Sequence, residues 1–120
     1  MIRKIVHIDK YWKVIVYYDI DYNFFNIIED DLIAIGSPVE EICDIATTIK
    51  KDGLAFTVTN FNKHISVTGF IKDDDIYNYL NSIVHEAEHI KQAILQEYDI
   101  EDKGEYSAYL VGYIFMKIIL

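Results

Sequence analysis

Residues Asn81–Lys91 read NSIVHEAEHIK and lie inside a longer stretch with helical periodicity. The apolar residues of this stretch recur at helical spacing and predict a core-facing stripe made of Ile76, Leu80, Ile83, Ala87, Ile90 and Ile94. Residues four apart lie one above the other on the same face of a helix. His85 and His89 are therefore expected to project side by side, away from the apolar stripe.

His85, Glu86 and His89 form an H-E-x-x-H motif. Two neutral imidazoles at this spacing can hold one Zn²⁺, and the neighbouring carboxylate can take a proton from the metal-bound water. The motif thus predicts His85 and His89 as metal ligands and Glu86 as the catalytic base. The face that carries them is polar but mostly uncharged, which is typical of a lined cleft, and comprises Asn78, Asn81, Ser82, His85, His89, Gln92 and Gln96. The structural alternative is a helix that carries two histidines without a metal.

A catalytic zinc ion usually has a third protein ligand and keeps its fourth position open. Glu105 is the candidate, because the segment from Ile90 to Gly104 is long enough to finish one helix, turn and start another that runs back. The small residues Ala108 and Gly112 follow on the same face and would allow close approach of the two helices. Asp102 and Glu105 also fit a helix-start signature, with Asp102 as the N-cap, so a capping role for Glu105 is the alternative.

The motif HEAEH at residues 85–89, followed by GEYSAYLVG at residues 104–112, resembles the short gluzincin-type zincins. It is most similar to minimal zincin-like proteins, sometimes called minigluzincins, and to small proteins of bacterial phage and mobile elements. The resemblance covers roughly residues 65 to 116. It implies that His85, His89 and Glu105 bind zinc and that Glu86 is the base. Tyr109 stands where many larger gluzincins carry an aspartate, so it is expected either to orient a histidine or to face the substrate.

The resemblance implies zinc-dependent peptide hydrolysis as the function. A second oxyanion donor is usual in such sites, and Tyr106, Tyr109 or Tyr113 could serve. Two alternatives stay open: a zincin-like module that binds zinc without hydrolysis, and an acidic interaction protein of a mobile element in which the motif is incidental.

Composition narrows the range of partners. The chain has 120 residues, is 52% hydrophobic and carries a net charge of −9, which predicts one domain over residues 1–120 with a real core. The negative charge disfavours nucleic acid and anionic membrane surfaces as partners. The longest apolar run near the end, Tyr109–Met116, is too short to span a bilayer. A single cysteine, Cys43, fits a reducing compartment, so a cytoplasmic protein is expected, with Cys43 buried as a small hydrophobe.

The remaining segments predict an α+β fold, in which a small antiparallel or mixed sheet packs with about three helices and the zinc site lies between the last two. Strands are expected at Tyr11–Tyr18, Leu54–Thr59 and His64–Ile71, with a further one at Lys4–Ile8 as an option. Residues Asn23–Ile28 read as a strand or as the approach to a short helix, and this is left open. Ser37, Pro38 and Glu40 predict the capped start of a helix that runs to about Lys51 and ends at Asp52–Gly53, with Val39 in its buried stripe.

The alternation of Phe56 and Val58 with Thr57 and Thr59 predicts a sheet with one buried face. Asp73–Asp75 are expected to cap the motif helix. The strand His64–Ile71 is expected to be the sheet edge that pairs with an extended peptide substrate. The last helix, Tyr106–Leu120, is apolar almost all round, which predicts either the centre of the core or a surface covered by another subunit.

Overall fold

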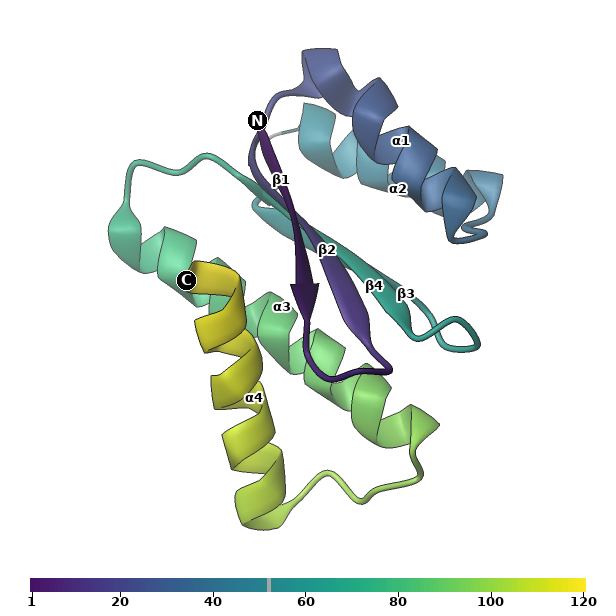
Figure 1. Ribbon diagram of the computed structural model, residues 1–120. Helices are drawn as coiled ribbons and strands as arrows, with labels where there is room; N and C mark the ends of the chain where they lie inside the picture. The colour runs from purple at the N-terminus through teal and green to yellow at the C-terminus, as the bar shows by residue number, and fades with distance from the viewer. Residues whose placement is uncertain (52) are drawn as a thin grey trace.

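The computed structural model describes residues 1–51 and 53–120 (Figure 1). Asp52, expected to help end a helix, lies outside the described residues. The elements follow one another as β1 (Ile2–His7), β2 (Lys13–Ile20), the short 3₁₀ helix η1 (Tyr22–Phe24), α1 (Phe25–Ala34), α2 (Val39–Lys50), β3 (Ala55–Asn60), β4 (Ile65–Ile71), α3 (Ile76–Glu97) and α4 (Gly104–Ile119). The α+β class is confirmed, with four helices in the described residues rather than about three.

The four strands form one mixed sheet in the order β1-β2-β4-β3. β1 and β2 pair antiparallel, as do β3 and β4, whereas β2 and β4 run parallel at its centre. The prediction that residues 64–71 form the sheet edge is therefore wrong. β4 is enclosed on both sides, and the edge strands are β1 and β3.

Helices cover both faces of the sheet (Figure 1). On one face, α1 and α2 bury Ile28, Leu32, Ile45 and Ile49 against one side of the strands. On the other face, α3 and α4 pack on the opposite side, and the buried residues there include Trp12, Val16, Phe70, Ile90 and Ile114. The prediction of a single buried sheet face is thus wrong, and the polar positions Ser66 and Thr68 lie fully buried on the α3 side.

Residues Phe25–Ala34 form helix α1 and not a strand. The side chain of Asp21 accepts a hydrogen bond from the backbone N–H of Asn23 and starts the 3₁₀ turn that leads into α1. Ile28, Leu32 and Ile35 then follow at helical spacing and are all buried. The short apolar run is compatible with either period in the sequence, and packing on the sheet selects the helical one.

Helix α2 starts one residue later than predicted, with Pro38 as an extended N-cap that makes no side-chain capping bond. Ser37 is therefore outside the cap, and its buried Oγ has no hydrogen-bond partner in the described residues. The helix buries Ile45 and Ile49, whereas Val39, predicted to be in the stripe, is 72% exposed.

Helix α3 agrees best with the sequence. The side chain of Asp75 accepts hydrogen bonds from the N–H groups of Tyr77 and Asn78 and caps the helix as predicted. Four residues of the predicted stripe are buried, namely Ile83, Ala87, Ile90 and Ile94. The other two, Ile76 and Leu80, lie in the first turns of α3 and are exposed. No helix in residues 1–51 and 53–120 combines the length and apolarity needed to cross a membrane.

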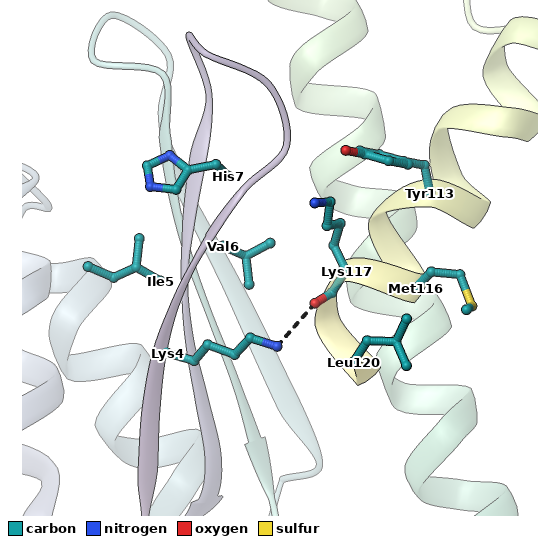
Figure 2. A pocket seen from close by; sticks show the side chains of 8 residues that line it. All are labelled: Lys4, Ile5, Val6, His7, Tyr113, Met116, Lys117 and Leu120. Carbon is teal, nitrogen blue, oxygen red and sulfur yellow. Dashed lines mark hydrogen bonds between the residues drawn. The ribbon is translucent and has the colours of Figure 1, made fainter.

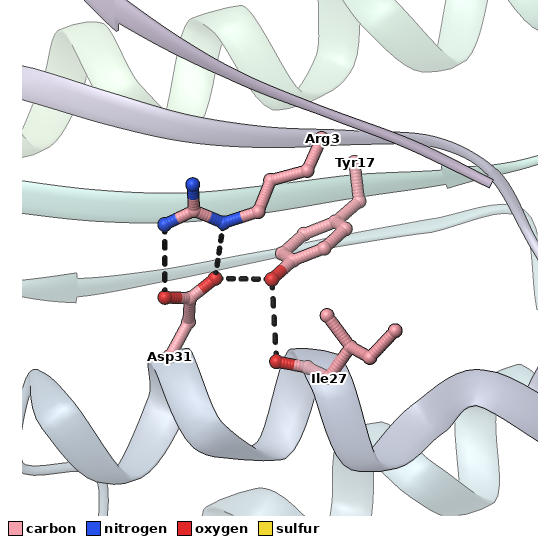
Figure 3. A network of polar contacts seen from close by, with 4 residues as sticks. All are labelled: Arg3, Tyr17, Ile27 and Asp31. Carbon is pink, nitrogen blue, oxygen red and sulfur yellow. Dashed lines mark hydrogen bonds and ion pairs between the residues drawn. The ribbon is translucent and has the colours of Figure 1, made fainter.

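A polar network joins β1, β2 and α1 (Figure 3). The Arg3 guanidinium donates two hydrogen bonds to the Asp31 carboxylate, at 2.8 and 3.1 Å, and the Tyr17 hydroxyl donates a third. Burial alone would raise the pKa of Asp31, but the bonds from Arg3 and Tyr17 outweigh burial and hold that pKa below its ordinary value. The network therefore stabilises the fold while Asp31 is ionised.

We expect Asp31→Asn to lower the free energy of unfolding at pH 7 by about 1 to 3 kcal/mol, because charge-assisted hydrogen bonds are lost. A lowered carboxyl pKa stabilises the fold above the pKa of the unfolded state, and that stabilisation is lost as the pH falls through the folded-state value. The difference between wild type and variant should consequently shrink below about pH 4, which urea denaturation at several pH values measures. The exposed neighbour Asp30 is the control. An equal loss in Asp30→Asn, or a difference independent of pH, would contradict the role of the network.

Candidate metal centre

His85 and His89 lie one turn apart on α3 and point toward each other. Their Nε2 atoms are 3.1 Å apart, and the His85 side chain is 67% exposed. In the free protein this contact is a hydrogen bond in which one ring donates. Two nitrogens bound to one tetrahedral zinc ion at the usual bond length are about 3.3 Å apart. The separation of the two Nε2 atoms is therefore close to the separation that a shared zinc ion requires.

Glu86 lies beside the histidine pair and is only 6% exposed. Its Oε2 is 3.9 Å from His85 Nε2, and its Oε1 accepts a hydrogen bond of 2.8 Å from the hydroxyl of Thr57 on β3. Thr57 in turn contacts the Thr68 hydroxyl at 2.9 Å, and Thr68 donates to the backbone carbonyl of Phe56. The half-buried Thr57, supported by the buried Thr68, thus holds the carboxylate of Glu86 next to the imidazoles.

A groove of about 610 Å³ runs between α3 and β3 in front of these side chains. Its walls comprise Glu41, Ala55, Phe56, Thr57, Val58, Thr59, Phe61, His85, Glu86, His89, Gln92, Ala93 and Gln96. The prediction that the polar stripe of the motif helix lines a cleft is therefore confirmed for its second half, from His85 to Gln96.

One side of the groove is the free edge of β3. The backbone N–H of Ile71 donates to the carbonyl of Leu54, and hydrogen-bonded pairs alternate along an antiparallel ladder. Phe56 and Val58 therefore direct their backbone groups toward β4, while Thr57 directs its N–H and C=O outward. An extended chain can pair with such an edge.

The structure does not bring Glu105 to the histidine pair. Glu105 is exposed in the first turn of α4 and is absent from the walls of the groove. Ala108 and Gly112 are also exposed, and a Cβ added at Gly112 would meet open space, so the predicted close approach through these residues is wrong. Within the described part of the chain, no three His, Cys, Asp or Glu side chains are grouped so that they could hold a metal ion.

The orientation of α4 follows from a buried lysine. Lys91 is 6% exposed and its Nζ lies 2.7 Å from Glu88 and 2.8 Å from Asp102, which also accepts a hydrogen bond from Ser107. Asp102 is thus an ion-pair partner and not the predicted N-cap. Together with buried Ile114, this contact turns the Ser107 side of α4 toward α3 and the Glu105 side toward solvent.

The tyrosines considered as oxyanion donors also lie elsewhere. Tyr109 is 75% exposed, and Tyr106 and Tyr113 are exposed as well. None of the three lines the groove. Cys43 is exposed on α2, so the prediction that it is buried is wrong.

Two groove residues, Thr57 and Glu41, were not singled out from the sequence, nor was Thr68, whose hydroxyl contacts that of Thr57. The alternation of Thr57, Thr59, Ser66 and Thr68 in the sequence could have indicated Thr57 and Thr68, because a polar sheet face can pack under a polar helix face as well as face solvent. Glu41 carries no local signal, since it reaches the groove only through the packing of α2 on the far side of β3.

Comparisons with protein-family models, with curated proteins and with solved structures gave no significant match.

Proposed function

We propose that the protein is a zinc-dependent hydrolase of peptide bonds, with His85 and His89 as metal ligands. The main support is the 3.1 Å separation of their Nε2 atoms at the wall of an open groove. When bound, zinc supplies Lewis acidity, which activates water and polarises a carbonyl.

Glu86 acts as the general base in this proposal. Its carboxylate lies next to His85 and is held by Thr57, so it is positioned to take a proton from the attacking water. The same carboxylate then returns the proton to the leaving amine. Glu86 already lines the groove, so its carboxylate needs no rearrangement of α3 to act.

The substrate in this proposal is an extended peptide or protein segment bound along β3. The outward N–H and C=O groups of Thr57, on the strand next to Glu86, support it. A peptide paired with this edge would have its backbone beside the histidine pair. The reducing compartment favoured by the single cysteine, Cys43, makes the cytoplasm the proposed location.

Glu105 remains the ligand predicted from the sequence, and its part in the site can be tested directly. In the arrangement described above, we expect Glu105→Gln to change zinc affinity by less than about twofold, because losses of tenfold or more accompany changes within the ligand sphere or its hydrogen-bond partners. Competition titration against a chromophoric chelator measures this affinity. A loss of tenfold or more would instead support a rearrangement of α4 that brings Glu105 to the metal.

The second candidate is a module that binds zinc without hydrolysis. Within residues 1–51 and 53–120 no third ligand is grouped with the histidines, whereas catalytic zinc sites usually have three protein ligands. Hydrolysis of a quenched fluorescent peptide library by zinc-loaded protein separates the two. Activity that disappears with a chelator and returns with zinc supports the hydrolase. Stable zinc binding without activity supports the second candidate, and absence of zinc binding contradicts both.

A further inference from the structure

The edge of the sheet opposite the histidine groove is also open. Among the described strands, β1 pairs only with β2. The backbone N–H of Ile8 donates to the carbonyl of Trp12, and the alternation of the antiparallel ladder then turns the backbone groups of Arg3, Ile5 and His7 away from β2. Another extended chain could pair with these groups.

A groove of about 520 Å³ lies between β1 and the last turns of α4 (Figure 2). Tyr113, Met116 and Leu120 form its apolar wall and remain exposed. On β1, Val6 points toward α4, whereas the side chain of Ile5, which also lines the groove, projects to the other side of the strand. A strand added beside β1 would therefore find room for an apolar side chain next to α4.

Basic groups border this groove. The ammonium of Lys4 donates to the backbone carbonyl of Lys117, and the ammonium of Lys117 lies over the ring of Tyr113. Among the described residues, neither lysine forms an ion pair with a carboxylate. A second hollow of about 250 Å³, which shares His7 with the first, is lined by Lys10, Lys13 and Lys63. In a chain of net charge −9, the fold thus places Lys117 at the same hollow as Lys4, and Lys63 at the same hollow as Lys10 and Lys13.

The basic residues at the β1 edge indicate which kind of chain can pair with it. β1 carries no carboxylate, so a second copy paired antiparallel through β1 would bring basic residues of both copies together, with Arg3 opposite His7 when the pairing is centred on Ile5, which is unfavourable. An acidic strand would instead place carboxylates near Lys4 and Lys117. Both copies of a self-pair would also carry a net charge of −9 and would repel each other. The ammonium groups of Lys4 and Lys117 therefore favour a short acidic segment of a different chain at this edge.

We propose that the free edge of β1 binds an acidic peptide segment in extended conformation, which adds a fifth strand to the sheet and seats an apolar side chain in the groove beside α4. This site is independent of the histidine groove, which lies along the other edge. It can operate whether or not the protein is a hydrolase.

The test uses a fluorescein-labelled nine-residue peptide of glutamates with one central leucine, measured by fluorescence anisotropy against the full chain. Successive side chains of a strand point to opposite faces, so this peptide can present leucine and glutamate together on the α4 side, where Lys4 lies. Ile5→Pro removes an outward N–H that β2 does not use, so the strand should survive while binding weakens at least about tenfold. The pair Lys4→Glu and Lys117→Glu should weaken binding by a similar factor. The matched control, Lys50→Glu with Lys72→Glu, makes the same charge change at a hollow lined by neither β1 nor α4, and should alter binding by less than about twofold.

Amide NMR signals of Arg3, Ile5 and His7 should shift on binding, and the spectra also verify that each variant is folded. The proposal is overturned by no saturable binding up to about 1 mM peptide, or by equal binding of a peptide with lysine in place of glutamate. Stronger binding of a single-stranded oligonucleotide would assign the surface to nucleic acid instead. Self-association that Ile5→Pro abolishes would assign it to a second copy.

Discussion

Glu86→Gln is expected to slow peptide hydrolysis by about 10²- to 10⁴-fold while zinc stays bound. Glutamine keeps the size of the side chain and can still accept the hydrogen bond from Thr57, so the packing of this buried residue should persist. It cannot take a proton from water. Steady-state kinetics on a peptide that the wild type cleaves, together with zinc content by elemental analysis, measure both halves of the expectation.

Glu88→Gln is the matched control, because it makes the same chemical change on the same helix. Glu88 pairs with Lys91, which keeps its second partner Asp102, so the variant should fold and retain activity. Full activity in Glu86→Gln would remove Glu86 from the mechanism. Equal losses in both variants would indicate a general effect of charge on α3.

Loss of either histidine should abolish stoichiometric zinc binding. We expect His85→Ala and His89→Ala each to weaken zinc affinity by more than about 100-fold, since changes to groups that merely support a ligand already cost 10- to 100-fold. Both side chains are exposed, so the variants should unfold at nearly the wild-type temperature. Isothermal titration with zinc gives the affinity, and circular dichroism gives the melting temperature.

His7→Ala is the control, because His7 is an exposed histidine on the opposite edge strand. It should bind zinc like the wild type. If His85→Ala and His89→Ala also kept wild-type affinity, the 3.1 Å contact would be only a hydrogen bond between two rings.

Helix α3 could be predicted from the sequence because its capping residue and the spacing of its apolar residues both indicate the same helix. Asp75 caps it, Ile83 and Ile90 face the core, and His85 and His89 share the opposite face. Local chemistry and the period of the apolar residues determine all of these features.

The orientation of α4 could not be predicted in the same way. Its sequence is apolar on nearly every side, so periodicity does not select the face that packs. The choice is made by the long-range ion pair of Lys91 with Asp102 and by the burial of Ser107 and Ile114. Glu105 consequently faces solvent, away from the position that a third ligand would need.

The order of the strands in the sheet could not be predicted from the sequence either. β3 and β4 form the expected hairpin, but either could have been the edge, and only the parallel pairing of β2 with β4 decides. That pairing joins segments far apart in the chain. It makes β3 the strand beside the histidine groove and carries Thr57 to Glu86.

The position of a bound zinc ion is the most direct test of the proposed site. Crystals grown with one equivalent of zinc chloride and measured at the zinc absorption edge should show an anomalous peak about 2.0 to 2.1 Å from Nε2 of both His85 and His89. A peak at other residues, or none near α3, would contradict the proposal that these two side chains form a metal centre.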